Sequence, residues 1–167
     1  MNNKKGWLVS DLLGRRVVSP YMETNRLFIA NDDMADFESY YWLAPDDFTG
    51  NKLTAYAQTM KVHVSWIQAR GDTGGRATKG PDVIIEGSGM KIGYGDRAYR
   101  DNNATIAWIM KEKGWYNIPE TVHDIARKRR TEYKGDAVTK LQFMTIINNV
   151  QRLMIRAKFH TDQIEGV

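Results

Sequence analysis

Several short stretches of the chain alternate apolar and polar residues, which is the pattern of a half-buried β-strand. The segment 61–66 places Val62, Val64 and Trp66 on one face and polar side chains on the other. The segment 153–159 repeats this alternation, with an inward set of Leu153, Ile155, Ala157 and Phe159. Segments 40–43 and 105–110 are short runs rich in aromatic or β-branched residues, which also favour strands. The chain is therefore expected to be rich in short strands.

A β-hairpin and one helix complete the expected elements. Segments 82–86 and 90–92 flank Gly87-Ser88-Gly89, where glycine supplies the positive φ of a tight hairpin turn. Thr139 followed by Gln142 predicts a capping box at the start of a helix spanning about residues 139–148. Its expected apolar stripe is Leu141, Phe143, Met144 and Ile147. Many strands with a single short helix predict a mainly all-β fold, an antiparallel β-sandwich.

Two segments lack this patterning and are expected to be loops. Residues 70–81 hold four glycines and a proline with almost no apolar side chain, and residues 113–136 are long, polar and basic. No repeat, low-complexity tract or linker divides the 167 residues, so we expect one domain over 1–167.

Composition leaves the cellular compartment open. The chain has no cysteine, which favours the cytosol, and residues 1–5 lack the apolar stretch of a secretory signal. It is either cytosolic or a fragment of a larger secreted protein. No apolar run could span a bilayer, and the net charge of +4 permits a polyanionic partner without requiring one.

Catalytic motifs are absent from the sequence. The three histidines are scattered without metal-ligand spacing, and no nucleophile elbow, phosphate-binding loop or zinc-protease motif occurs. We therefore expect no enzyme and no cofactor. Asp32 and Asp33 are candidates for a structural calcium site, because carboxylates are calcium ligands.

A family resemblance sharpens this interpretation. The run from Tyr41-Trp42-Leu43-Ala44-Pro45 through Leu53 to Tyr56 resembles the laminin IV type A (laminin B) domain. Matching blocks follow in order at 80–83, 86–92 and 143–157, so the resemblance covers nearly the whole chain. Departures are Thr49 where leucine is usual, Ala57 where glycine is usual, and a longer loop at 113–136.

The resemblance implies a jelly-roll-like sandwich set between laminin-type EGF-like modules of a secreted basement-membrane protein. A perlecan-type proteoglycan is the first expected parent and a laminin α or γ chain the next, with residues 1–5 a linker or an added tail. The family is regarded as spacers and docking surfaces rather than enzymes. Other extracellular-matrix proteins are the expected partners, and neither nucleic acid nor membrane insertion is expected.

Three motifs could carry binding or modification. Arg70-Gly71-Asp72 is an integrin-recognition tripeptide, whose carboxylate could complete a metal site on the receptor. The cluster Arg127-Lys128-Arg129-Arg130 is a solvated loop, a heparan sulfate (glycosaminoglycan) site or a processing site. Asn103-Ala104-Thr105 is an N-glycosylation acceptor.

The sequence also leaves open a second function, that of a carbohydrate-binding module. Sandwiches of this kind bind carbohydrate through exposed aromatic side chains, here Tyr94, Tyr99, Trp115 or Tyr116. An exposed row of these rings would favour a carbohydrate-binding module, and burial would argue against it. A glycosidase would need two carboxylates facing each other in a cleft.

Overall fold

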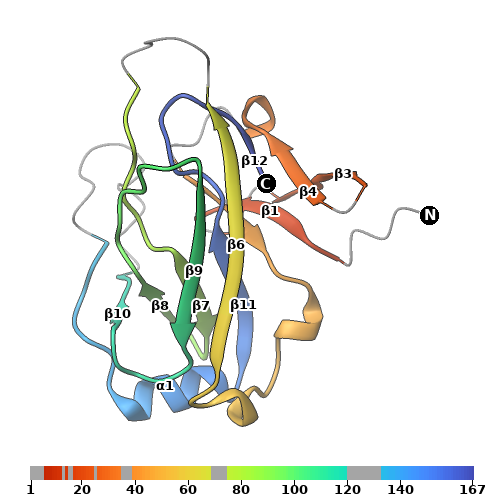
Figure 1. Cartoon of the computed structure of the whole chain (residues 1–167). Coiled ribbons are helices and arrows are strands. Elements are labelled where there is room, and N and C mark those ends of the chain that lie inside the picture. The colour runs from red at the N-terminus through yellow and green to blue at the C-terminus, as the bar shows by residue number, and fades with distance from the viewer. Residues whose placement is uncertain are drawn as a thin grey trace.

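The structure is a computed structural model. It describes residues 6–12, 14, 17–24, 26–34, 39–68, 75–119 and 133–167, apart from the side chains of Asp32 and Met34. Two antiparallel sheets face each other and enclose the core (Figure 1). The predicted mainly all-β sandwich is confirmed, and the larger part of the described chain lies in strands or in the turns between them.

The larger sheet has seven strands in the order β10-β8-β7-β11-β5-β1-β2. In chain order these strands are β1 (Leu8–Asp11), β2 (Val17–Val18), β5 (Tyr40–Leu43), β7 (Val83–Gly87), β8 (Met90–Tyr94), β10 (Trp115–Asn117) and β11 (Val150–Arg156). The predicted hairpin is β7–β8, and its two turn residues, Ser88 and Gly89, have φ values of 50° and 73°. Positive φ at both positions is the geometry of a type I′ turn.

The smaller sheet has five strands in the order β3-β4-β12-β6-β9. They are β3 (Tyr21–Glu23), β4 (Arg26–Ala30), β6 (Thr59–Gln68), β9 (Asn103–Ile109) and β12 (Gln163–Gly166). In Figure 1, β6 and β9 run in front of β7 and β11 of the larger sheet. The longest ladder joins β6 to β9, from Thr59 opposite Ile109 to Ser65 opposite Asn103.

Helix α1 (Lys140–Ile147) lies at one end of the sandwich (Figure 1). Its capping box is formed: Thr139 Oγ1 accepts from the Gln142 backbone N–H at 3.2 Å, and Gln142 Oε1 accepts from the Thr139 N–H at 3.0 Å. One prediction for the helix is wrong, because Leu141 is 78% exposed. The side chains that α1 buries are Phe143, Ile146 and Ile147. Three short 3₁₀ helices, η1 (Asn31–Met34), η2 (Asp46–Phe48) and η3 (Leu53–Ala55), complete the elements.

The main core lies between the sheets, where the alternating residues predicted from β6 and β11 meet. Val64 and Trp66 are buried from one side, and Leu153 and Ile155 from the other. Trp66 stacks on Phe159 with ring centroids 4.5 Å apart. Such close-packed apolar contact is the main favourable contribution to folding.

A second apolar cluster covers the outer face of the larger sheet. It consists of Tyr41, Ile84, Tyr116, Ile118, Tyr133 and Met154. This cluster corrects the prediction that residues 113–136 form one polar loop, because β10 runs from 115 to 117 and both Ile118 and Tyr133 are buried. It also explains why β11 is buried on both faces, including Arg156 at 1% exposure.

Candidate functional site

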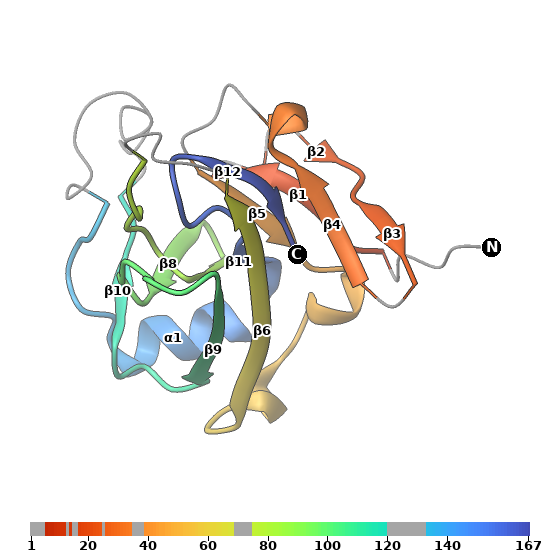
Figure 2. The same ribbon diagram turned by 45° about the horizontal axis from the view of Figure 1, so that its top comes forward.

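A gap between strands β4 and β6 of the smaller sheet, beside the strand β12 that pairs with both, forms the candidate site. Strand β12 lies between β4 and β6, with Gly166 opposite Ile29 on one side and opposite Trp66 on the other. The next residue, Val167, exchanges two backbone hydrogen bonds with Ser65, at 2.9 and 2.8 Å. Strand β6 continues beyond this point to Thr59, while β4 diverges from it (Figure 2). We call the resulting space the β4/β6 groove.

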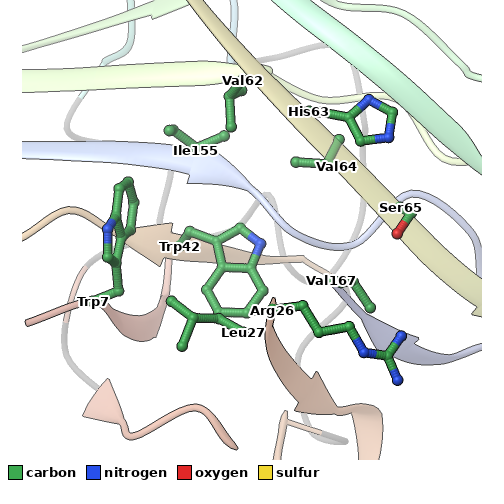
Figure 3. A pocket seen from close by; sticks show the side chains of 10 residues that line it. All are labelled: Trp7, Arg26, Leu27, Trp42, Val62, His63, Val64, Ser65, Ile155 and Val167. Carbon is green, nitrogen blue, oxygen red and sulfur yellow. The ribbon is translucent and has the colours of Figure 1, made fainter. Parts of the chain in front are cut away.

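The groove is an apolar hollow of about 380 Å³. Trp42 of β5 and Ile155 of β11, from the opposite sheet, face into it (Figure 3). Leu27 of β4 lies on one side and Val62 of β6 on the other (Figure 3). The residues lining the hollow are Trp7, Arg26, Leu27, Trp42, Val62, His63, Val64, Ser65, Ile155 and Val167. The groove therefore opens onto the main core between the two sheets.

The rim of the groove carries polar and charged side chains. Lys61 and His63 are exposed on β6, and the His63 Nδ1 lies 3.4 Å from Thr105 Oγ1. Arg26 on β4 is half-exposed and pairs with Glu23 at 3.0 Å. Its guanidinium also lies 3.9 Å from a carboxylate oxygen of Glu165. The groove thus combines an apolar floor with a rim whose described cations stand on both flanking strands.

A buried ion pair lies on the outer side of the larger sheet. Arg156 Nη1 is 3.3 Å from Asp82 Oδ1, and both side chains are 2% exposed. The Tyr99 hydroxyl donates to Asp82 Oδ2 at 2.9 Å. Burial raises the pKa of the Asp82 carboxyl above its ordinary value, while the Arg156 charge and the Tyr99 hydrogen bond oppose that rise. This arrangement holds loops together rather than presenting a reactive group.

Another hollow, of about 360 Å³, lies beside β8 and β10 and has charged residues in its lining. Two carboxylates line it, Asp82 and Asp96. Asp82 is held by the ion pair above, and Asp96 accepts a hydrogen bond from Tyr133 and lies 3.7 Å from the Lys134 ammonium. Both carboxylates are therefore committed to internal partners, which does not match the water-activating pair of a glycosidase.

The structure describes only some of the predicted binding residues. Arg70-Gly71-Asp72 and Arg127-Lys128-Arg129-Arg130 lie outside the described residues. Asn103 is exposed and is the first residue of β9, opposite Ser65. The predicted glycan acceptor is thus on the surface of the smaller sheet, and its glycosylation stays a prediction.

Asp32 and Asp33, the two residues predicted to bind calcium, lie in η1. The side chain of Asp32 lies outside the description, and Asp33 is half-buried. Within the described part of the chain, Asp33 Oδ2 and the neighbouring Asn31 Oδ1 are enclosed without a hydrogen-bond partner. That same part contains no group of three or more acidic, histidine or cysteine side chains placed to hold a metal ion. Calcium binding stays a prediction.

The aromatic residues proposed for sugar stacking do not form an exposed row. Trp115 and Tyr116 are buried, at 2% and 6% exposure, and Tyr94 and Tyr99 are half-buried. Trp115 packs against Phe143 with ring centroids 5.6 Å apart. Burial of these rings removes the surface that carbohydrate binding by them would need.

Sequence patterning missed both the groove and the buried ion pair. No described helix is long and apolar enough to cross a membrane.

The fold defines an antiparallel β-sandwich module with an apolar groove between β4 and β6 of its smaller sheet. Comparison with known proteins then gives its family: the family described as Laminin B (Domain IV) matches residues 41–167, and the chain belongs to it. The resemblance seen in the sequence is thereby confirmed.

Known relatives and a solved structure agree with this assignment. Human laminin subunit alpha-1 is 27% identical over 171 residues, covering 96% of this chain and 5% of the human protein. The mouse laminin subunit alpha-1 is 26% identical over the same length and the same shares. The L4b domain of human laminin alpha-2 has the same fold, with a TM-score of 0.76 at 18% identity, covering 99% of this chain and 89% of that chain. The expected order of parents, perlecan-type before laminin, stays a prediction.

Proposed function

We propose that this chain is a non-catalytic structural and docking module of a secreted basement-membrane protein. The observation that carries the proposal is the match of the Laminin B (Domain IV) family over residues 41–167. Since the chain spans 5% of the laminin alpha-1 relatives, its place in the matrix, its EGF-like neighbours and its matrix partners belong to the proposal.

The packing supports a module of fixed shape. Apolar clusters cover both faces of the larger sheet, and Arg156 ties β11 to two other segments of the chain. A domain buried on this scale keeps its described strands and helix in one geometry. That property suits both a spacer and a platform for binding loops.

Binding is assigned to surface features in this proposal. Arg70-Gly71-Asp72 is the candidate integrin contact, and Arg127-Lys128-Arg129-Arg130 is the candidate heparan sulfate contact. Asn103 is the candidate carrier of an N-glycan, and its exposure at the start of β9 supports that role. A carbohydrate-binding module acting through the basic cluster is the alternative.

The proposal is tested by deposition in matrix. The domain is produced with a secretion signal in cells that lay down basement membrane, and the detergent-insoluble matrix is probed for it. We expect secretion, retention in the matrix and a mass that falls on enzymatic removal of N-glycans. Recovery of all the protein from the medium would contradict docking.

The sequence offers a matched control for the glycan. Asn103→Gln should abolish the mass shift, because it removes the acceptor of Asn103-Ala104-Thr105. Asn102→Gln, one residue earlier and outside the acceptor motif, should leave the shift unchanged. A shift that persists in Asn103→Gln would place the glycan elsewhere.

A further inference from the structure

We infer that an apolar pocket near the α1 end of the sandwich receives one apolar side chain of a partner protein, of the size of phenylalanine. The pocket is a hollow of about 150 Å³ between the two sheets, and η2 and η3 form its outer wall. We call it the η2/η3 pocket. This inference rests on the proposed docking function and names an anchor point for the partner.

Two cross-strand pairs, one from each sheet, form the inner walls of the pocket. Met60 of β6 lies opposite Trp108 of β9. On the other side, Leu153 of β11 lies opposite Ile85 of β7. Figure 1 shows these four strands converging on the end of the sandwich that α1 covers. An entering side chain would therefore make apolar contact with both sheets.

Backbone hydrogen bonds hold the outer wall in place. Gly50 exchanges two of them with Val150, at 2.8 and 2.9 Å. Further along the chain, the Ala57 N–H donates to the Met110 carbonyl at 2.8 Å. The wall between residues 50 and 57 is thus fixed at both ends, and it could close onto the sheets only by breaking these bonds. The pocket is formed before a ligand arrives, which lowers the cost of binding.

Volume and lining together select one uncharged ring. An apolar cavity of about 150 Å³ engineered in another protein stays dry and binds benzene, which has the ring of phenylalanine. Met60 and Met110 line the pocket here, and thioether side chains adapt readily to an aromatic group. The Trp108 indole N–H donates to the Met110 sulfur at 3.3 Å, so this donor is satisfied without water.

The rim carries one side chain of each charge. Asp47 of η2 is exposed, and Lys52, directly before η3, is half-buried. Among the ion pairs of the described residues, neither side chain takes part in one. An apolar residue with one basic and one acidic neighbour would complement this rim. A free hydrocarbon would make no use of these charges, so we assign the occupant to a protein segment, whose buried anchor would supply most of the affinity.

The first test adds capped amino acids to the whole 167-residue chain. Ac-Phe-NH₂ should bind at least tenfold more tightly than Ac-Ala-NH₂, which has the same backbone without the ring. The methyl signals of Met60 and Met110 and the indole N–H signal of Trp108 should shift in NMR spectra. Equal binding of the two compounds would overturn the inference. So would binding of benzene without binding of Ac-Phe-NH₂, because the pocket would then be closed to a tethered side chain.

A substitution in the outer wall has a matched control in the same short helix. Ala55→Leu places a larger side chain in the pocket and should abolish binding of Ac-Phe-NH₂. Thr54→Leu introduces the same side chain at an exposed position outside the lining and should leave binding unchanged. Loss of binding in both variants, or in neither, would place the ring elsewhere. If Ala55→Leu does not fold, the methionine signals of the unaltered chain decide the question.

Short charged peptides test the rim. Either Ac-Lys-Phe-Glu-NH₂ or Ac-Glu-Phe-Lys-NH₂, according to the direction of the bound segment, should bind about threefold more tightly than Ac-Ser-Phe-Ser-NH₂. Asp47→Asn combined with Lys52→Gln should remove this difference and leave the binding of Ac-Phe-NH₂ unchanged. Equal binding of all three peptides to the unaltered chain would contradict the assignment to a protein segment.

Matrix retention separates the inference from the proposed function. We expect Ala55→Leu to be retained less than Thr54→Leu, because only the first fills the pocket. Equal retention of the two variants would overturn the anchor role and leave the docking function standing. Recovery of the unaltered domain from the medium would contradict the docking function, while binding of Ac-Phe-NH₂ would still decide whether the pocket accepts a side chain.

Discussion

The guanidinium of Arg156 lies 3.3 Å from the carboxylate of Asp82, and neither side chain is more than 2% exposed. The backbones of the same two residues are also joined, since the Arg156 N–H donates to the Asp82 carbonyl at 2.9 Å. Arg156 further donates to the carbonyls of Thr78 and Arg97, at 2.6 and 2.9 Å. One side chain thus joins the final long strand to the segments on either side of the β7–β8 hairpin.

Removing this guanidinium should strongly destabilise the fold. Arg156→Met leaves the Asp82 charge buried without its partner, and the expected loss in the free energy of unfolding is about 3–5 kcal/mol. Denaturant unfolding of the variant measures this loss. Arg152→Met is the control on the same strand, because its pair with Glu86 is more exposed, at 35% and 19%, and should contribute about 1 kcal/mol or less.

A double variant separates the contribution of the Arg156–Asp82 ion pair from that of the other hydrogen bonds made by Arg156. Asp82→Asn combined with Arg156→Met removes both charges, so the loss should be smaller than the sum of the two single losses. Additive losses would show that the Arg156 contribution lies in its hydrogen bonds to Thr78 and Arg97 rather than in the pair.

The backbone at Ala57 accounts for a departure from the family pattern. Ala57 has a φ of 65°, in the left-handed region that glycine adopts without cost, and glycine is the usual residue here in the resemblance. Ala57→Gly should therefore raise the free energy of unfolding, by about 1 kcal/mol, because L-residues pay roughly 1–2 kcal/mol in this conformation. Thermal and denaturant unfolding measure the gain. Ala55→Gly, inside η3, should instead lower stability, and a loss at both positions would refute the strain argument.

Alkaline pH should unfold the domain through its buried tyrosines. Burial raises the pKa of Tyr99 from 10.0 to about 12, with the Asp82 charge adding to the rise. Burial likewise raises the pKa of Tyr40, Tyr41 and Tyr116. The folded form therefore holds protons that the unfolded chain releases near pH 10. The stability from the Tyr99 hydroxyl is complete below pH 10 and is lost as the pH rises through about 12. The hydroxyls of Tyr40, Tyr41 and Tyr116, whose pKa values are raised further, keep their contribution to still higher pH.

This predicted loss of stability at high pH is tested by measuring tyrosinate absorbance and the free energy of unfolding over the same pH range. We expect a group of tyrosines to ionise only as the protein unfolds, and Tyr99→Phe to make the fall in stability with pH less steep. Tyrosinate formation that runs ahead of unfolding would contradict the argument.

The strands and the helix could be predicted because local patterns encode them. The inward residues of β6 and of segment 153–159 alternate as predicted, and Thr139 with Gln142 forms the capping box that the spacing indicates. Arg156 could not be predicted as buried, since the same alternation assigns it to the solvent face. That face is covered by segments distant in the chain, including Thr78 and Tyr133.

The groove could not be predicted for a related reason. Its lining comes from segments far apart in sequence, among them Leu27, Trp42 and Ile155, which only the folded sheets bring together. The outer-face cluster likewise depends on Ile118 and Tyr133, two apolar residues within a segment that composition marks as polar. In both cases tertiary contact overrides local pattern.

Cell attachment tests the Arg70-Gly71-Asp72 motif. Asp72→Glu lengthens the side chain by one methylene and would displace the carboxylate from a receptor metal site, so attachment to the immobilised domain should be lost. Asp46→Glu, an exposed acidic residue in η2, is the matched control and should leave attachment intact. Equal attachment to Asp72→Glu and the unaltered domain would show that the tripeptide is not an integrin contact.

Heparin chromatography tests the cluster Arg127-Lys128-Arg129-Arg130. Replacing all four residues with glutamine should lower the salt concentration needed for elution, because several neighbouring cations share one polyanion and salt screens that attraction. The control variant replaces four exposed cations from elsewhere, Lys79, Arg100, Lys111 and Lys113, with the same change in net charge. An equal reduction in both variants would mean that heparin responds to overall charge, whereas loss confined to the cluster variant would identify a local glycosaminoglycan site.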